Sequence, residues 1–280
     1  MKLTANSANS RVGFFRFWSD RFSSGARNRQ LISQLVKLRL TQQYKRTFLG
    51  SVWIVFGPLL GIAIWLVLNY SGVYKPGETS IPYAGYLLLS MSIWIFFTNF
   101  YKLIATCVSE SGRMLMEVPL NMEAKIMERI MVAIVNFIIP FTLNIILLLI
   151  LGVDFSFQSL LFFPTLIPLI LVGISFGVFV SLIEVVFNDI YIIASQGLTL
   201  LMYFTPVVYT NNVDSPFLQS AFKYNPLTYL LSVPRDLLIG APINNWANYW
   251  ISAGLALVLF IIVIQFFFKS YSKIVERIFE

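Results

Sequence analysis

The sequence contains no histidine and a single cysteine, Cys107, among its 280 residues. Without histidine, the chain has no imidazole for acid–base catalysis and none of the usual histidine-bearing zinc sites. One cysteine cannot form a disulfide within the chain. The first 30 residues hold no continuous apolar segment. We therefore expect no cleavable signal peptide, and we expect the first membrane span to act as the insertion signal.

The phosphate-binding sequence G-x-x-x-x-G-K-[ST] is also missing. ATP binding of that kind therefore cannot reside in this chain. Charged residues make up only 12% of the sequence and are almost absent from its long apolar runs. Because a proton- or sodium-coupled carrier usually has an acidic residue within the membrane, this pattern argues against secondary transport.

Apolar residues dominate instead, at 58% of the chain. An apolar run of about 20 residues predicts a membrane helix, because a helix satisfies its own backbone hydrogen bonds across the hydrocarbon. We predict an all-α membrane protein with a cytoplasmic N-terminal part (1–49), a six-span transmembrane domain (50–268) and a cytoplasmic tail (269–280). The six predicted spans are 50–70, 82–106, 130–151, 160–186, 190–209 and 246–268.

The formal net charge of +7 is unevenly distributed along the chain. The first 49 residues carry ten Lys or Arg residues against one acid, Asp20, whereas the predicted outer side has only Lys75, Lys223 and Arg235. The positive-inside rule then places both termini in the cytoplasm, in agreement with six spans. The basic excess is thus a topology signal, with attraction to anionic membrane lipids as a secondary effect, and we expect no nucleic-acid partner.

Residues 30–48 precede the first span and have an amphipathic pattern. Leu31, Leu35 and Leu38 fall on one helical face, although Arg39 and Arg46 interrupt the apolar arc. This pattern predicts a helix that lies in the membrane interface, parallel to the bilayer.

Two connections are unusual in length and composition. The segment 107–129 is polar, and Pro119 would interrupt a helix there. Either a solvated loop or a short helix that docks a partner fits this segment. The external region 210–245 is too apolar for a plain loop and too short for two further spans. A pair of re-entrant helices fits it, since irregular backbone at membrane depth requires protein or a water-filled cavity around it.

The start of the first span contains Gly57 and Gly61 in a G-x-x-x-G pattern. Small residues at this spacing let two helices approach closely. This glycine face could pack against another span of the same chain, pack against a second protomer, or line a pore. Trp53 fits a membrane-interface anchor. Arg46, just before the span, could extend to the interface or bind a phosphate.

The second and fifth spans carry aromatic and polar faces. Aromatic rings beside hydroxyl groups can stack on sugar faces without tight binding, which suits a sliding polymer. Ordinary helix packing is the alternative, since 16% of all residues are aromatic. The candidate channel-lining residues are Tyr86, Ser90, Trp94, Phe97 and Tyr101 in the second span, and Thr199 and Tyr203 in the fifth.

Several short motifs together resemble the membrane subunits of polysaccharide-exporting ABC transporters, the type-2 exporter permease family. R-x-x-L-G-x-x-W followed by G-P runs from Arg46 to Pro58. F-N-D at 187–189 is similar to a family F-R-D, with Asn188 in place of Arg. The other two motifs are E-V-P-L (Glu117, Val118, Pro119 and Leu120) and N-P-L-T-Y-x-x-x-x-x-R-D, which includes Asn225, Pro226, Arg235 and Asp236. The resemblance covers roughly residues 30–268.

The resemblance implies a homodimer bound to two copies of a separate ATPase subunit, which would bind the ATP and Mg²⁺. It implies that the amphipathic helix and a coupling helix at Glu117–Leu120 contact the ATPase. It also implies that Arg46 and Trp53 lie where a lipid-linked substrate enters, and that Asn225, Pro226, Arg235 and Asp236 belong to an external gate. This chain would then hold no cofactor, would not be an enzyme, and would lie in the bacterial cytoplasmic membrane.

The sequence thus predicts the channel-forming subunit of an ATP-driven exporter of a lipid-linked polysaccharide, such as O-antigen or capsule. Export of teichoic acid, or of small molecules by a type-2 exporter, is an alternative. A membrane enzyme that acts on lipid-linked sugars is a third. Its carboxylates would have to be Glu184 and Asp189.

Overall fold

The computed structural model describes residues 28–44, 52–110, 122–153, 155, 157–210 and 215–278, with the backbone alone at 44, 53–55, 58 and 271–278. All regular structure in these residues is helical, which confirms the all-α prediction. The helices are α2 (Arg29–Tyr44), α3 (Trp53–Tyr70), α4 (Tyr83–Ala105), α6 (Met122–Ile150), η3 (Phe157–Leu161), α7 (Phe162–Glu184), α8 (Asp189–Tyr203), α9 (Pro216–Tyr224), α10 (Pro226–Leu238) and α11 (Trp246–Ile278).

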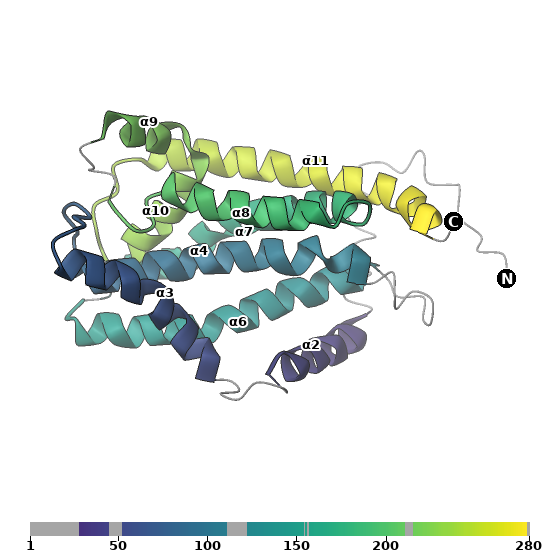
Figure 1. Ribbon diagram of the computed structural model, residues 1–280, viewed down its shortest axis with the longest axis horizontal. Helices are drawn as coiled ribbons and strands as arrows, with labels where there is room; N and C mark the ends of the chain where they lie inside the picture. The colour runs from purple at the N-terminus through teal and green to yellow at the C-terminus, as the bar shows by residue number, and fades with distance from the viewer. Residues whose placement is uncertain are drawn as a thin grey trace.

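The long helices form a bundle along the longest axis of the molecule (Figure 1). Helices α3, α4, α6, α7, α8 and α11 follow one another in alternating directions, whereas α9 and α10 gather at one end and α2 lies toward the other. Helix α4 is central, because it contacts α3, α6, α7, α8 and α10. Helix α11 packs on α7 and α10.

Four helical segments among the described residues are long and apolar enough to cross a bilayer: Tyr83–Ala105, Met122–Ile150, Phe157–Glu184 and Trp246–Ser270. The apolar part of α3 is shorter, at Leu59–Tyr70, and α8 has 15 residues. The chain therefore has the composition and helix lengths of a multi-pass membrane protein.

Two helices extend beyond the predicted spans. Helix α6 begins at Met122, whereas the apolar pattern predicted a start at 130, and α11 continues to Ile278 rather than 268. The added first turns of α6 read MEAKIMER, which is rich in good helix formers. Hydropathy locates the part of a helix that lies in lipid, whereas helix propensity can extend the same helix beyond it.

Local sequence signals separate the short helices α9 and α10. Ser215 and Asn225 are their N-caps, and each accepts a hydrogen bond from a backbone N–H in the first turn. Pro216 and Pro226 follow the caps at the first helical position, where the missing proline N–H is not needed. Helix α10 ends at Leu238, and Gly240, two residues farther on, has a φ of 68°, a conformation that glycine adopts without strain.

Helices α4 and α7 approach each other closely because of two glycines in α7. A Cβ atom on Gly173 would lie 2.9 Å from the backbone oxygen of Phe97, and one on Gly177 would lie 2.9 Å from Ile104 Cβ and 3.0 Å from the backbone oxygen of Tyr101. A Cβ atom at 2.9 Å from either neighbour would force the two helices to shift apart. Gly173 and Gly177 thus form a G-x-x-x-G contact inside the chain.

Candidate functional site

The side chain of Arg235, in α10, is buried with 4% of its surface exposed. Its Nη1 donates to the hydroxyl of Tyr86 at 2.7 Å and to the carbonyl of Pro206 at 3.0 Å. Its Nε donates to Asp236 Oδ1 at 2.9 Å. The guanidinium carbon also lies 4.4 Å from the centre of the Tyr86 ring. A buried charge is stable only when its donors are paired, so Arg235 fixes α10 against α4 and the segment after α8.

The segment 204–210, which follows α8, is held by several hydroxyl groups. The hydroxyl of Tyr83 donates to the carbonyl of Val208 at 2.8 Å, and that of Tyr74 donates to the same carbonyl at 3.2 Å. The hydroxyl of Tyr86 donates to the carbonyl of Tyr209 at 3.0 Å. Burial raises the pKa of Tyr74, so this hydroxyl stays protonated and remains a donor. These bonds join the end of α8 to the start of α4.

Asn225 ties the same segment to the junction between α9 and α10. Its amide nitrogen donates to the carbonyl of Phe204 at 2.7 Å and to Thr205 Oγ1 at 2.9 Å, while its amide oxygen caps α10 by accepting from the N–H of Leu227 at 3.0 Å. Pro226 is exposed. The four predicted gate residues are therefore at the two ends of α10, and Asn225 and Arg235 both hold the 204–210 segment.

The aromatic stripe predicted to line a channel lies inside the protomer. The exposed fractions of its five members are 3% for Tyr86, 0% for Ser90, 4% for Trp94, 1% for Phe97 and 0% for Tyr101. The reason is that α4 is the central helix, enclosed by its neighbours. The arrangement does not support a channel-lining role for these side chains, and it favours the packing alternative, with Tyr86 as a partner of Arg235 and Tyr101 as a donor to the Tyr191 carbonyl.

Thr199 and Tyr203 of α8, by contrast, are exposed. So are Gly57 and Gly61 of α3, where an added Cβ atom would meet nothing within 4 Å. The ring of Tyr203 lies 6.1 Å from that of Trp65, which brings α8 and α3 together at this point. The described chain thus supplies no helix that packs against the Gly57–Gly61 face.

Some predicted site residues lie outside the described part of the chain. These are Arg46 and the coupling-helix residues Glu117, Val118, Pro119 and Leu120, together with the side chain of Trp53. Among the carboxylates of the membrane-enzyme alternative, Glu184 is buried and Asp189 is exposed. Within the described residues, no group of three or more Cys, Asp or Glu side chains could hold a metal ion.

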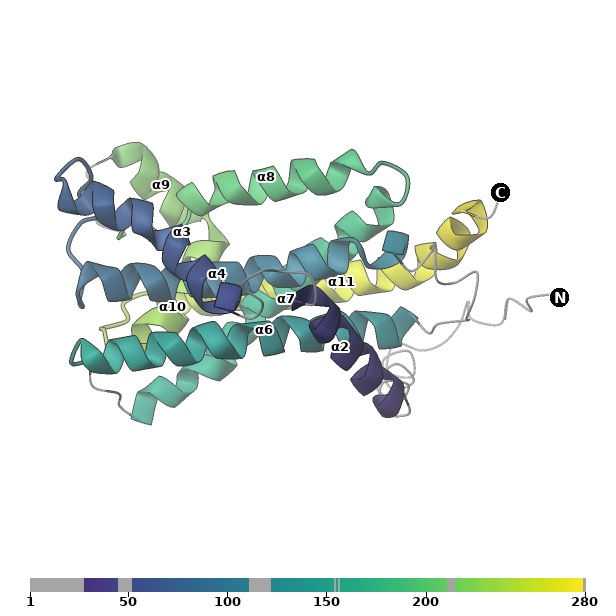
Figure 2. The same ribbon diagram turned by 60° about the horizontal axis from the view of Figure 1, so that its bottom comes forward.

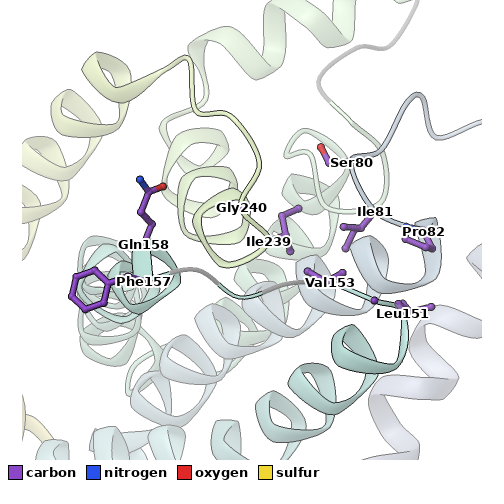
Figure 3. Close-up of a pocket in the computed structure, with 10 residues that line it drawn as sticks. Ser80, Ile81, Pro82, Leu151, Val153, Phe157, Gln158, Ile239 and Gly240 are labelled. Atoms are coloured by element: carbon purple, nitrogen blue, oxygen red, sulfur yellow. The ribbon is translucent and has the colours of Figure 1, made fainter.

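Two hollows mark opposite ends of the bundle. One, of about 800 Å³, lies between the α3–α4 connection, the α6–η3 connection and the end of α10, and its lining includes Ser80, Gln158 and Gly240 (Figure 3). None of the described residues in its lining is charged. The other, of about 520 Å³, is lined by charged side chains of α2, of the turn 107–110, of α6 and, at Glu184, of α7.

The charges beside the second hollow form one connected cluster, which the sequence reasoning did not find. Glu110 binds Arg39, with an Oε2–Nη1 distance of 3.3 Å, and also binds Arg129. Glu128 lies 3.6 Å from Lys125 and 3.4 Å from Arg129. The sequence signal was Arg39, a charged residue within the apolar arc of residues 30–48. Nearby, burial raises the pKa of the Cys107 thiol to about 12, so it is protonated at neutral pH.

These features define a multi-pass helical membrane protein, and no cluster of side chains in its described residues could hold a metal ion. The family model described as the ABC-2 type transporter matches residues 30–239, and the chain belongs to this family. The prediction made from the short motifs is thereby confirmed.

Two curated relatives carry the same description, an O-antigen export system permease protein RfbA. The protein from Myxococcus xanthus is 23% identical over 206 residues, which cover 73% of this chain and 78% of that protein. The protein from Klebsiella pneumoniae is 24% identical over 212 residues, with the same coverage of 73% and 78%.

Proposed function

We propose that this chain is the channel-forming transmembrane subunit of an ATP-driven exporter that moves a lipid-linked polysaccharide across the cytoplasmic membrane. The observation that carries the proposal is the family match over residues 30–239. The two RfbA relatives, which are O-antigen export permeases, favour a polysaccharide of O-antigen or capsule type over teichoic acid or small molecules. The bundle of long apolar helices supports a transmembrane role.

The energy source belongs to a partner in this proposal. The sequence lacks the phosphate-binding loop, so ATP and Mg²⁺ are bound by a separate ATPase, and this chain holds no cofactor and catalyses no reaction itself. Two copies of the chain assemble with two ATPase subunits. Helix α2 and the segment at 117–120 contact the ATPase on the cytoplasmic side.

Six helices span the membrane in the proposed topology: α3, α4, α6, α7, α8 and α11. Their alternating directions and the many Lys and Arg residues of the first 49 positions support cytoplasmic termini. Helices α9 and α10 then form the external re-entrant pair. The buried Arg235 and the cap at Asn225 hold this pair and the 204–210 segment together as the exit gate.

In this proposal the substrate passes along the exposed faces of α3 and α8 rather than along the buried aromatic residues of α4. Arg46 and Trp53 lie at the cytoplasmic entry, near the phosphates of the lipid-linked substrate. Gly57 and Gly61 on α3, with Thr199 and Tyr203 on α8, face the second protomer or the channel between the two copies. Their exposure in the single chain supports this assignment, because a seam or channel face has no partner within one protomer.

Co-purification with the ATPase encoded beside this chain tests the proposal. A tagged chain in nanodiscs is expected to retain the ATPase as a stable two-plus-two complex that hydrolyses ATP. Mass photometry gives the stoichiometry, and an unrelated membrane protein with the same tag is the control. A chain that stays folded and binds no ATPase, in several detergents and in nanodiscs, would contradict the proposal and favour the membrane-enzyme alternative.

A further inference from the structure

Helix α2 lies across the end of α6 (Figure 2), and Arg39 is its member of the charge cluster described above. The guanidinium of Arg39 contacts two carboxylates on different elements. Its Nη1 is 3.3 Å from Glu110 in the turn 107–110, and its Nε is 3.8 Å from Glu128 in α6. The side chain is only 27% exposed, so water screens these pairs less than it screens a fully exposed surface pair.

The two carboxylates also have partners within the bundle. Glu110 accepts from Arg129, whose side chain is 0% exposed, and Glu128 contacts both Lys125 and Arg129. Buried charges of this kind are tolerated only as a set, because each neutralises and solvates the others. The Glu110–Arg129 pair thus joins the turn 107–110 to α6.

Arg39 has a different position in the cluster from Lys125 and Arg129. It is the member that α2 contributes, whereas the other two cations and both carboxylates belong to the turn 107–110 and to α6. Without Arg39, each carboxylate keeps at least one cationic partner inside the bundle. Loss of Arg39 would therefore leave the local bundle paired and remove the ionic link from α2.

We propose that Arg39 is a positioning residue that holds α2 rigidly on α6 through Glu110 and Glu128, so that movement of α2 by the ATPase is transmitted to the spans. This inference rests on the proposed function, in which α2 contacts the ATPase. A hollow of about 520 Å³ borders the cluster on one side. Helix α2 also contacts α6 at Gln43 and Asn136, and the ion pairs of Arg39 add the link to Glu110 and Glu128.

Arg39→Gln tests the link in the complete complex of this chain and its ATPase, reconstituted in proteoliposomes. ATP hydrolysis is expected to continue, while the amount of polysaccharide exported per ATP falls by about fivefold or more, the lower end of typical coupling energies. Lys102→Gln is the matched control, since it removes the same charge from an exposed position in the last turn of α4, which the proposal does not place against the ATPase. Arg39→Met is a second variant that keeps the side-chain volume. Export per ATP at the wild-type level in either Arg39 variant would overturn the inference.

Cross-linking α2 to α6 distinguishes loss of the ionic connection between these helices from a general loss of protein function. The amide of Asn136 on α6 donates to Gln43 Oε1 on α2 at 3.3 Å, so these positions are adjacent. In an Arg39→Gln chain that also carries Gln43→Cys and Asn136→Cys, a short bifunctional thiol reagent is expected to restore export per ATP. The native Cys107 should not interfere, because it is buried. Complete cross-linking without any recovery would also overturn the inference.

The proposed function fails in a different way. A wild-type chain that forms no complex with the ATPase, or that exports nothing, would contradict the exporter itself and the inference with it. A wild-type complex that exports normally, together with an unaffected Arg39→Gln variant, would contradict the inference alone.

Discussion

Alanine at Gly173 or Gly177 is expected to destabilise the protein, although alanine is the better helix former by about 1 kcal/mol. The new methyl group would lie 2.9 Å from the backbone oxygen of Phe97 at one position and 2.9 Å from Ile104 Cβ at the other. Because neither atom is at the end of a flexible side chain, α4 and α7 must separate. Overpacking of this kind typically costs about 1–3 kcal/mol. Leucine at either position should prevent the native packing of the two helices.

The matched controls are Gly57→Ala and Gly61→Ala, which change the same motif on α3. An added Cβ atom there meets nothing within 4 Å, so the stability of the protomer should not fall. Thermal unfolding of the purified variants in one detergent, followed by tryptophan fluorescence, measures the difference. Equal melting temperatures for all four alanine variants would contradict the close α4–α7 contact. If the α3 face is a protomer seam, the control variants should instead lose self-association.

Replacement of Arg235 by glutamine is expected to lower the stability of the external end by about 3 kcal/mol. The variant removes the donors that reach the Tyr86 hydroxyl and the Pro206 carbonyl, and it leaves Asp236 without its ion pair. The 204–210 segment should then exchange its backbone amides faster, since one of its fixed points is lost. Hydrogen exchange measured by mass spectrometry reports this directly.

Two further variants complete the Arg235 test. Arg235→Lys keeps the charge but loses the several N–H donors of the planar guanidinium. Its amide exchange rates should therefore lie between those of Arg235→Gln and wild type. Lys223→Gln removes an exposed charge from the same end and should change nothing there. Wild-type exchange in the 204–210 segment of Arg235→Gln would show that Arg235 does not hold this segment.

The sequence was sufficient for the helical class and the family, because both depend on patterns that are local or linear. The apolar run predicted at 82–106 is helix α4 at Tyr83–Ala105, and that at 160–186 contains α7 at Phe162–Glu184. The Ser-Pro and Asn-Pro pairs at the caps of α9 and α10 are local signals of the same kind. Where a helix continues beyond lipid, as in α6 and α11, hydropathy gives no boundary.

The contacts between helices could not be inferred from the sequence in the same way. The chain has G-x-x-x-G patterns at 57–61 and 173–177, and only the second is a helix contact within the protomer. The aromatic residues of α4 are regularly spaced along the sequence. This spacing does not show that other helices enclose α4. Arg39 and Glu110 are 71 residues apart, so their pairing depends on how α2 crosses α6.

ATP-dependent transfer of a lipid-linked polysaccharide is the most direct measurement of the proposed function. Vesicles would contain this chain, its ATPase and a lipid-linked polysaccharide on the ATPase side, and a glycan-binding lectin would detect the polymer on the opposite side. The account predicts lectin binding that requires both proteins, ATP and Mg²⁺. Lectin binding at the same rate without this chain or without ATP, or none at all from a complex that hydrolyses ATP and transports small molecules instead, would contradict it.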